Sequence, residues 1–205
     1  MAENLKVTHY RNGDAISNIT NNDDWGSADE GQYGVYDNDP ANAEVYGNLY
    51  NWTVVNDDRG VCPTGFHVPS DSALKMLEMG LGMSEEDANS TGWRGTDEGS
   101  KLAGNNDLWD NDDLENNSEF GTSGFNALPA GYRTSSSGGY GGMGNYCYFW
   151  SSSENTSSTA WYRVLSYGYS NVNRDYNYKQ NGFSIRCLSD EIQTGTILVP
   201  EDFPT

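Results

Sequence analysis

The segment FWSSSENTSSTAWYRVLSYGYSNVNRDYNYKQNGFSIRC, residues 149–187, decides the fold of this chain. Apolar residues alternate in it with Tyr, Asn, Ser and Gly. From Trp161 onward the period is two, which is the period of a β-strand. Trp161 and Leu165 then share one strand face, and Tyr162 and Val164 share the other. We expect the first pair to point into the core and the second pair to point outward.

Tyrosines are concentrated in this segment and give it the chemistry of a recognition surface. Tyr side chains supply rigid contact area at low entropic cost, and Ser, Gly and Asn supply adaptable hydrogen bonds, as in antibody-type binding loops. The segment therefore predicts a surface presented to a binding partner.

The composition of the whole chain limits the classes of fold and partner. A length of 205 residues favours one domain, which we place at residues 1–190, followed by a tail at 191–205 that forms an edge strand or a connector. The 24 Gly and 14 Tyr favour strands and loops over a helical bundle. A net charge of −19 argues against a nucleic-acid partner. No apolar run reaches the ~20 residues of a membrane helix, so we expect no direct membrane insertion, and the first residues contain no signal peptide.

One helix is clearly indicated, in VPSDSALKMLEMGLG at residues 68–82. Ser70 is a good N-cap, and the apolar spacing predicts a helix over residues 70–79. Ser84, with Asp87 three residues later, predicts a second short helix. The segment 44–55 is compatible with either a helix or a strand. We expect residues 134–146, rich in Gly and Ser, to form a flexible loop that takes part in binding.

Three further features of the sequence are an extended segment, a loop-rich region and a set of cysteines. Residues 5–10 are a candidate extended segment. Residues 91–124 are loop-rich, and we expect Trp93 and Trp109 to anchor them in the core. Three cysteines, Cys62, Cys147 and Cys187, allow one disulfide and leave one thiol over.

The sequence lacks the patterns of the common catalytic and cofactor sites. Pairs of acids such as Asp57 and Glu154 are expected by chance on a surface with 30 acidic residues. There is no nucleophile elbow, P-loop or dinucleotide fingerprint, and His9 and His67 are isolated. NNDDW and DLWDNDDLENN supply oxygen atoms without the spacing of a calcium loop. We expect no enzyme activity, no cofactor and no bound metal.

Several motifs together resemble a known family. WGSADEG, GNLYNWTVVNDDRGVCPTGFHVPSD, GFNALPAGYR, FWSSSE, AWYR and KQNGFSIRCL occur in the order seen in the Fibrobacter succinogenes major paralogous domain. The resemblance covers roughly residues 1–190. It implies an α+β, C-type lectin-like fold with two helices and a twisted antiparallel sheet that carries long loops. Many members resemble the variable proteins of diversity-generating retroelements, whose C-terminal codons are rewritten at adenines.

The resemblance also implies roles for individual residues. Cys62 and Cys187 match the family's usual cysteines and are a possible disulfide, whereas Cys147 should be a free thiol. The tail after Leu188 departs from the family pattern. The expected ligand-binding residues, which combine positions that vary in such proteins with tyrosines of the preceding loop, are Tyr140, Tyr146, Tyr148, Tyr162, Val164, Ser166, Tyr167, Gly168, Tyr169, Asn173, Asp175, Tyr176, Asn177 and Tyr178.

Three functions are compatible with these observations. The leading hypothesis is a receptor-recognition module, exposed on a bacterial cell surface or a phage tail fibre, that binds a protein or glycan ligand on another cell or surface. The alternative is a carbohydrate-binding accessory module or a carbohydrate-active enzyme domain whose aromatic rings stack on sugars. In a structural surface domain, by contrast, the tyrosines would merely pack and most of them would be buried.

Overall fold

A computed structural model describes residues 3–26 and 29–190. Within these ranges the helices are α1 (Pro40–Tyr46), α2 (Trp52–Val55), α3 (Asp71–Gly80), α4 (Glu85–Asn89), α5 (Glu98–Leu102) and α6 (Asp113–Asn116). Two 3-10 turns are η1 (Tyr36–Asn38) and η2 (Asn106–Leu108). The strands are β1 (Ser17–Asn18), β2 (Gln32–Gly34), β3 (Leu49–Tyr50), β4 (Phe66–His67), β5 (Gly92–Arg94), β6 (Ala130–Arg133), β7 (Tyr140–Met143), β8 (Tyr146–Thr156), β9 (Thr159–Ser166), β10 (Tyr169–Tyr178) and β11 (Leu188–Ser189). The predicted tail lies outside the described residues.

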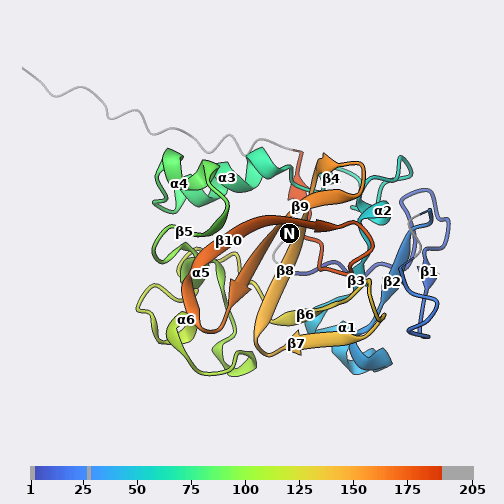
Figure 1. Ribbon diagram of the computed structural model, residues 1–205, viewed down its shortest axis with the longest axis horizontal. Helices are drawn as coiled ribbons and strands as arrows, with labels where there is room; N and C mark the ends of the chain where they lie inside the picture. The colour runs from blue at the N-terminus through green and yellow to red at the C-terminus, as the bar shows by residue number, and fades with distance from the viewer. Residues whose placement is uncertain (1–2, 27–28, 191–205) are drawn as a thin grey trace, which may run out of the picture.

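The main sheet has six strands in the order β5-β10-β9-β8-β6-β7. Strands β8, β9 and β10, from the segment that decides the fold, form its long twisted centre (Figure 1). All pairs are antiparallel except β6 with β8, which is parallel. The expected twisted antiparallel sheet is thus present, with one parallel pair added, because the β6–β7 hairpin brings the chain back to enter β8 in the direction of β6.

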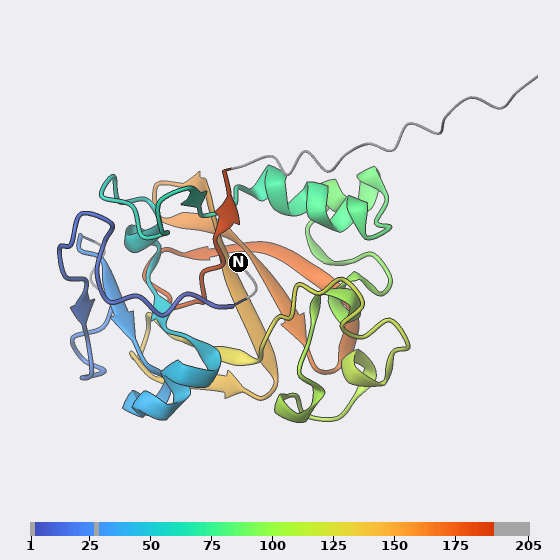
Figure 2. The same cartoon turned by 180° about the vertical axis from the view of Figure 1, so that it is seen from behind.

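The smaller elements lie around this sheet. Strands β1, β2 and β3 form a small sheet, and β4 pairs with β11. Figures 1 and 2 show α3 and α4 at the end of the molecule opposite to α1, in both views. A disulfide joins Cys62 to Cys187, with the Cα atoms 5.9 Å apart, and so confirms the pairing that the family resemblance implied. Cys147 is unpaired and buried, and burial raises the pKa of its thiol to about 12.

Strand register divides the side chains of the main sheet between two faces. Phe149 lies opposite Arg163, and Cys147 opposite Leu165, on a face that we call the helix face because α3 packs on it. The alternate residues lie on the other face, which we call the tyrosine face. Its members from β6, β8, β9 and β10 are Tyr132, Tyr146, Tyr148, Trp150, Tyr162, Val164, Ser166, Asn173, Asp175 and Asn177.

Helix α3 begins where the capping pattern predicted. The Ser70 hydroxyl accepts a hydrogen bond from the backbone N–H of Ala73 at 3.1 Å. Ser84 caps α4 in the same way, since its hydroxyl accepts from the N–H of Asp87 at 3.0 Å. Both helix predictions are confirmed, and the first fixes the direction in which the acids of α3 approach the sheet.

Buried ion pairs attach α3 to the helix face. Glu78 accepts from Arg94 and from Arg163, each at 2.6 Å. Asp71 accepts from Arg163 at 2.8 Å and from Arg174 at 2.7 Å. All five residues are buried. Burial alone would raise the pKa of Asp71, but hydrogen bonds and charges from Arg174 and Arg163 outweigh it and lower that pKa to about 2.

Several local expectations need correction. Residues 5–10 form no strand, only an isolated bridge between His9 and Ala15. The segment 44–55 contains the end of α1, β3 and α2 rather than a single element. The expected flexible loop at 134–146 includes β7, which pairs with β6. This hairpin depends on glycine, because a Cβ at Gly131 would lie 2.4 Å from the carbonyl oxygen of Gly141.

The two tryptophans of the loop-rich region differ in how far they are buried. Trp109 is 5 % exposed and packs in the core, as predicted. Trp93 is 39 % exposed and lies on the edge strand β5, with its ring 4.6 Å from that of Tyr169. Its predicted core position is wrong because β5 ends the sheet and leaves one side of the ring without a neighbour.

With two longer helices, α1 and α3, and a twisted mixed sheet, the fold confirms the expected α+β class. Within the described residues, no helix has the length and apolarity to cross a membrane.

Candidate functional site

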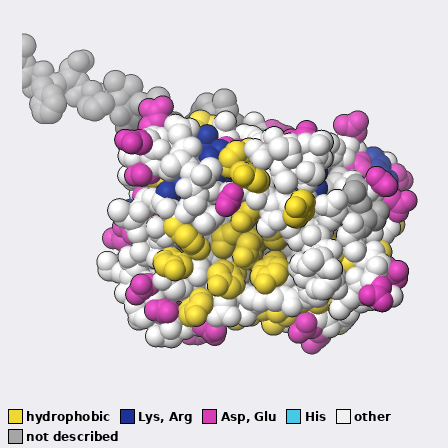
Figure 3. All heavy atoms as spheres, viewed as in Figure 1, with side chains coloured by type: hydrophobic (Ala, Val, Ile, Leu, Met, Phe, Trp, Pro, Cys, Tyr) yellow, Lys and Arg dark blue, Asp and Glu magenta, His cyan; other side chains and the backbone are white. Residues whose placement is uncertain are grey.

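The tyrosine face carries a connected cluster of aromatic rings. Tyr148 on β8 lies at its centre, with its ring centroid 4.8 Å from Phe183 and 5.2 Å from Tyr132. Tyr162 and Tyr146 complete the contacts of Tyr148, at 5.8 Å and 6.0 Å. In the space-filling view, hydrophobic side chains gather over β8, β9 and β10, and acidic side chains lie mostly around the margin (Figure 3).

The Tyr148 and Tyr162 phenols of this cluster stay neutral across the physiological range. Burial, followed by the nearby charge of Asp175, raises the pKa of Tyr162 to about 12, although a hydrogen bond from Asn177 acts in the opposite direction. Burial also raises the pKa of Tyr148. The centre of the tyrosine face is therefore an uncharged aromatic surface on a strongly acidic protein.

A hollow of about 380 Å³ opens at one end of the cluster, and we call it the ring hollow. Its lining residues are Tyr132, Thr134, Ser135, Ser136, Tyr148, Asn177, Tyr178, Asn181 and Phe183. Asn181 holds the rim together: its side-chain oxygen accepts from the N–H of Ser135 at 2.8 Å, and its amide donates to Asn177 at 2.9 Å. The hollow thus joins β6, β8 and β10 to the 134–137 turn.

The structure corrects the predicted exposure of three site residues on β9. Tyr162 is 9 % exposed, Val164 4 % and Ser166 2 %. They do lie on the face opposite to Leu165, as the alternation predicted, but this face is covered as well. The rings of Tyr148 and Phe183, from neighbouring segments, lie over Tyr162 at 5.8 Å and 5.2 Å.

The most exposed of the predicted site residues are three tyrosines of β10. Tyr169, Tyr176 and Tyr178 are 52 %, 49 % and 59 % exposed. Tyr178 lines the ring hollow, whereas Tyr169 lies at the other end of the strand against Trp93. The expected single patch is therefore divided into an exposed pair at each end of β10 and a half-buried centre.

Trp161 is half-buried rather than committed to the core. Its ring lies 5.6 Å from that of Tyr176, and the Arg174 guanidinium covers it at 3.8 Å. Tyr176 and Tyr178 lie opposite Trp161 and Thr159, so the register places them on the same side of β10 as Arg174 and not on the tyrosine face. Tyr178, the last residue of the strand, nevertheless lines the ring hollow.

The other predicted site residues fall into three groups. Asn173, Asp175 and Asn177 are half-buried on the tyrosine face and surround Tyr162 and Val164 from β10. Tyr167 and Gly168 form the β9–β10 turn. Both are half-buried, and Tyr167 packs against the core cluster of the helix face and against Tyr146 at 6.5 Å.

Tyr140 is not brought to the cluster. Its ring lies 5.3 Å from Tyr36, its hydroxyl donates to Asn38 at 3.2 Å, and the Arg133 guanidinium lies 4.6 Å from its centroid. The pairing of β7 with β6, which the loop prediction did not include, directs Tyr140 to these neighbours.

Sequence reasoning missed three residues that line the ring hollow, namely Tyr132, Asn181 and Phe183. Tyr132 alternates with the buried Arg133 on β6, so a period-two pattern in GFNALPAGYR could have placed it on the tyrosine face. Phe183 is only 2 % exposed, yet it lines the ring hollow. No local pattern marks Asn181, because its role depends on the distant 134–137 turn.

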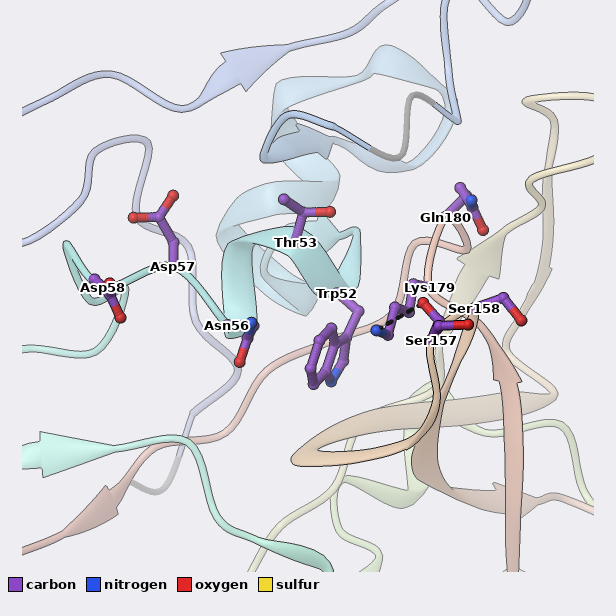
Figure 4. A pocket seen from close by; sticks show the side chains of 9 residues that line it. All are labelled: Trp52, Thr53, Asn56, Asp57, Asp58, Ser157, Ser158, Lys179 and Gln180. Carbon is purple, nitrogen blue, oxygen red and sulfur yellow. Dashed lines mark hydrogen bonds between the residues drawn. The ribbon is translucent and has the colours of Figure 1, made fainter.

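A second hollow of about 450 Å³ lies beside α2, and we call it the lysine hollow (Figure 4). Trp52 is 3 % exposed, and the Lys179 ammonium lies 4.5 Å from its ring centroid, so this ring offers no open stacking surface. Lys179 also donates to Glu154 at 2.6 Å. Asp57 binds Arg59 at 2.7 Å, so neither acid of the pair considered from the sequence is free of a cation.

Comparisons with known proteins identify the family of the chain. No group of three or more His, Cys, Asp or Glu side chains placed to hold a metal ion occurs among residues 3–26 and 29–190. Neither the search of curated proteins nor that of solved structures found a match. The family model of the Fibrobacter succinogenes major domain matches residues 1–189, and the chain belongs to this family.

Proposed function

We propose that this domain is a non-catalytic binding module that recognises a ligand on another cell or surface through the tyrosine face and the exposed tyrosines of β10. The observation that carries the proposal is the accumulation of neutral aromatic rings, amides and hydroxyls on one face of a rigid sheet. Aromatic anchors ringed by small polar groups are typical of recognition sites, where a few such residues supply most of the binding energy.

The ligand that suits this surface best is a protein. Sugar-binding platforms need open, flat rings, whereas the exposed Trp93 and Tyr169 are tilted by 37° to each other and the Trp52 ring is covered by Lys179. The surface of the tyrosine face is irregular, with exposed rings at both ends of β10 and a hollow beside one of them. A glycan ligand remains the alternative that the experiment distinguishes.

The position of this surface supports a second part of the proposal, that it is diversified by a retroelement. Tyr, Asn, Ser and Asp residues alternate in β9 and β10 with the arginines that hold α3. Recoding that is confined to the codons of the first set would leave the arginines, and with them the attachment of α3, unchanged. Sequencing the DNA beside the gene tests this: a near-identical repeat that differs at adenines, next to a reverse-transcriptase gene, is expected, and its absence would contradict diversification.

A binding experiment tests the recognition function. The labelled domain is incubated with a panel of bacterial cells and with a glycan array, beside a variant that carries Tyr169→Ala, Tyr176→Ala and Tyr178→Ala. A control variant carries Val45→Ala and Met76→Ala, which remove other exposed apolar side chains. Cell binding that falls at least about tenfold only in the tyrosine variant supports the proposal. Equal binding by both variants contradicts it, and binding that free sugar competes away identifies a glycan ligand.

A further inference from the structure

We propose that the ring hollow is an anchor site for one phenol or indole side chain of a protein ligand. This inference rests on the proposed function of the tyrosine face and adds the chemistry of the residue that the face selects. Three properties of the hollow lead to it: aromatic walls, the absence of charge in its lining, and a polar rim that is already hydrogen-bonded.

The walls of the hollow fit a flat ring. Tyr148 and Phe183 stack at 4.8 Å with an angle of 25° between their planes, and Tyr132 meets Tyr148 edge-on at 5.2 Å. Aromatic rings prefer offset-stacked and edge-to-face neighbours, and the half-buried rings of Tyr132 and Tyr148 leave part of their surface open to such a neighbour. The volume of about 380 Å³ is large enough to take one aromatic side chain.

The electrostatics of the hollow favour an uncharged guest. None of its lining residues is an acid, a lysine, an arginine or a histidine. Burial raises the pKa of Tyr148, so its phenol is neutral when the protein is folded. A carboxylate or ammonium group placed here would lose hydration without gaining an ionic partner, which carries a high cost.

The hydrogen-bonding capacity of the rim favours a ring with a single polar atom over a sugar. The Asn181 oxygen already accepts from Ser135, and the Asn177 oxygen accepts from both Asn181 and the N–H of Tyr178. The side-chain amide of Asn177 is hydrogen-bonded to the phenol of Tyr162. A sugar ring has several hydroxyls to satisfy, and these two asparagines, which are already engaged, are poorly placed to satisfy them. Phenol and indole each bring one polar group to an otherwise apolar ring.

Small probes test the anchor without knowledge of the whole ligand. N-acetyl-tyrosinamide and N-acetyl-tryptophanamide are titrated into the isotope-labelled protein, and the ring resonances of Tyr132, Tyr148 and Phe183 are followed by NMR. We expect saturable shifts at these rings with a weak dissociation constant, on the order of millimolar. Methyl glucoside and N-acetyl-aspartate amide should bind at least about tenfold more weakly.

A matched pair of variants tests whether the probes bind in the ring hollow. Ser136 is exposed at the ring hollow and Ser157 is exposed at the lysine hollow, so Ser136→Trp fills the first and Ser157→Trp fills the second. The inference requires that Ser136→Trp weakens probe binding at least about tenfold while Ser157→Trp leaves it unchanged, with both variants retaining the wild-type melting temperature. If Ser136→Trp unfolds, Ser136→Leu serves as the second filling variant.

The outcomes separate this inference from the proposed function. Stronger binding of the sugar probe, equal effects of the two tryptophan variants, or no shift at the three rings would overturn the anchor site. Cell binding that depends on the exposed tyrosines would still support the proposed function in each of those cases. Probe binding in the ring hollow without any tyrosine-dependent cell binding would support the anchor alone.

Discussion

The two faces of the main sheet satisfy their polar groups in opposite ways. The helix face buries three arginines against two acids of α3, at distances of 2.6 Å to 2.8 Å. The tyrosine face places neutral phenols, amides and hydroxyls around Tyr148. Breaking one partner of a buried ion pair is strongly destabilising, whereas a half-exposed ring or amide can be exchanged at small cost. Successive residues of one strand can therefore differ in this respect: one is costly to replace, and the next can be replaced at small cost.

The contacts of the helix face fix the backbone of β10. Arg174 reaches Asp71 through buried contacts, while its neighbours Asn173 and Asp175 lie half-buried on the tyrosine face. The backbone positions of Asn173 and Asp175 are thus fixed by bonds that these two residues do not make. Substitutions that change the chemistry of the tyrosine face should leave its geometry intact, which is the requirement for a surface that can acquire new ligands.

The largest effect is expected from breaking the helix face. Glu78→Ala removes the partner of both Arg94 and Arg163 and leaves two buried guanidinium groups with lost ion pairs. We expect a loss of about 5 kcal/mol in the free energy of unfolding, measured by urea denaturation. The matched control is Glu44→Ala, which breaks the exposed pair with Lys6 and should cost less than about 1 kcal/mol. Similar losses for the two variants would contradict the proposed role of the buried network.

Removal of the most buried ring beside the hollow should have the next largest effect. Phe183 is 2 % exposed and contacts Tyr148, Trp150 and Tyr162. Phe183→Ala should cost about 3–4 kcal/mol, in the lower part of the range for such changes because the ring hollow lets the site relax. Phe183→Leu keeps most of the volume and should cost less than about 1.5 kcal/mol. Equal losses for the two variants, in the same denaturation experiment, would show that the packing is not limiting.

Acid should weaken the helix face before it affects the tyrosine face. The folded-state pKa of Asp71 is about 2, below the ~3.9 of an unfolded aspartate, so its ionised form is stabilised by folding. The resulting stability is fully present above about pH 4 and is lost as the pH falls toward about 2. We expect the urea midpoint to fall across this window in the wild type. Asp71→Asn should be less stable at pH 7 and should show a smaller fall; an unchanged profile would contradict this assignment.

The sequence predicted those features that depend on local chemistry. Ser70 and Ser84 cap their helices as expected, because capping involves residues only three positions apart. The alternation of Trp161 to Ser166 was also correct as a statement of strand faces. The disulfide of Cys62 and Cys187 could be expected only from the family resemblance, since its cysteines are separated by 125 positions.

The predictions that were wrong concern features that depend on residues distant in the sequence. Alternation assigns Tyr162 and Val164 to a face but does not reveal that Tyr148 and Phe183 cover that face. Likewise, strand alternation does not reveal the acidic partners of Arg163 and Arg174, because Asp71 is brought to them by the packing of α3. The ring hollow needed both kinds of information, because its lining comes from three separate parts of the chain.

The smallest effect on stability, and the largest on binding, is expected at the exposed tyrosines. Tyr169, Tyr176 and Tyr178 are each about half exposed, so replacement of any one by Ala should change the free energy of unfolding by only about 0.5 kcal/mol. Partner binding should respond in a different order. Tyr178 borders the ring hollow, so Tyr178→Ala should weaken binding most, by more than about 2 kcal/mol if it is a hot spot.

Tyr169 provides the internal control for this last prediction, because it lies at the other end of β10 against Trp93. Tyr169→Ala should reduce binding less than Tyr178→Ala when both are measured against the same cells by flow cytometry. Each variant is also compared with its Phe counterpart, which keeps the ring and loses the hydroxyl. If Tyr178→Phe binds as well as the wild type while Tyr178→Ala does not, the ring itself makes the contact. If both tyrosines can be removed without loss of binding, the ligand does not use β10, and the chemical contrast between the two faces serves stability alone.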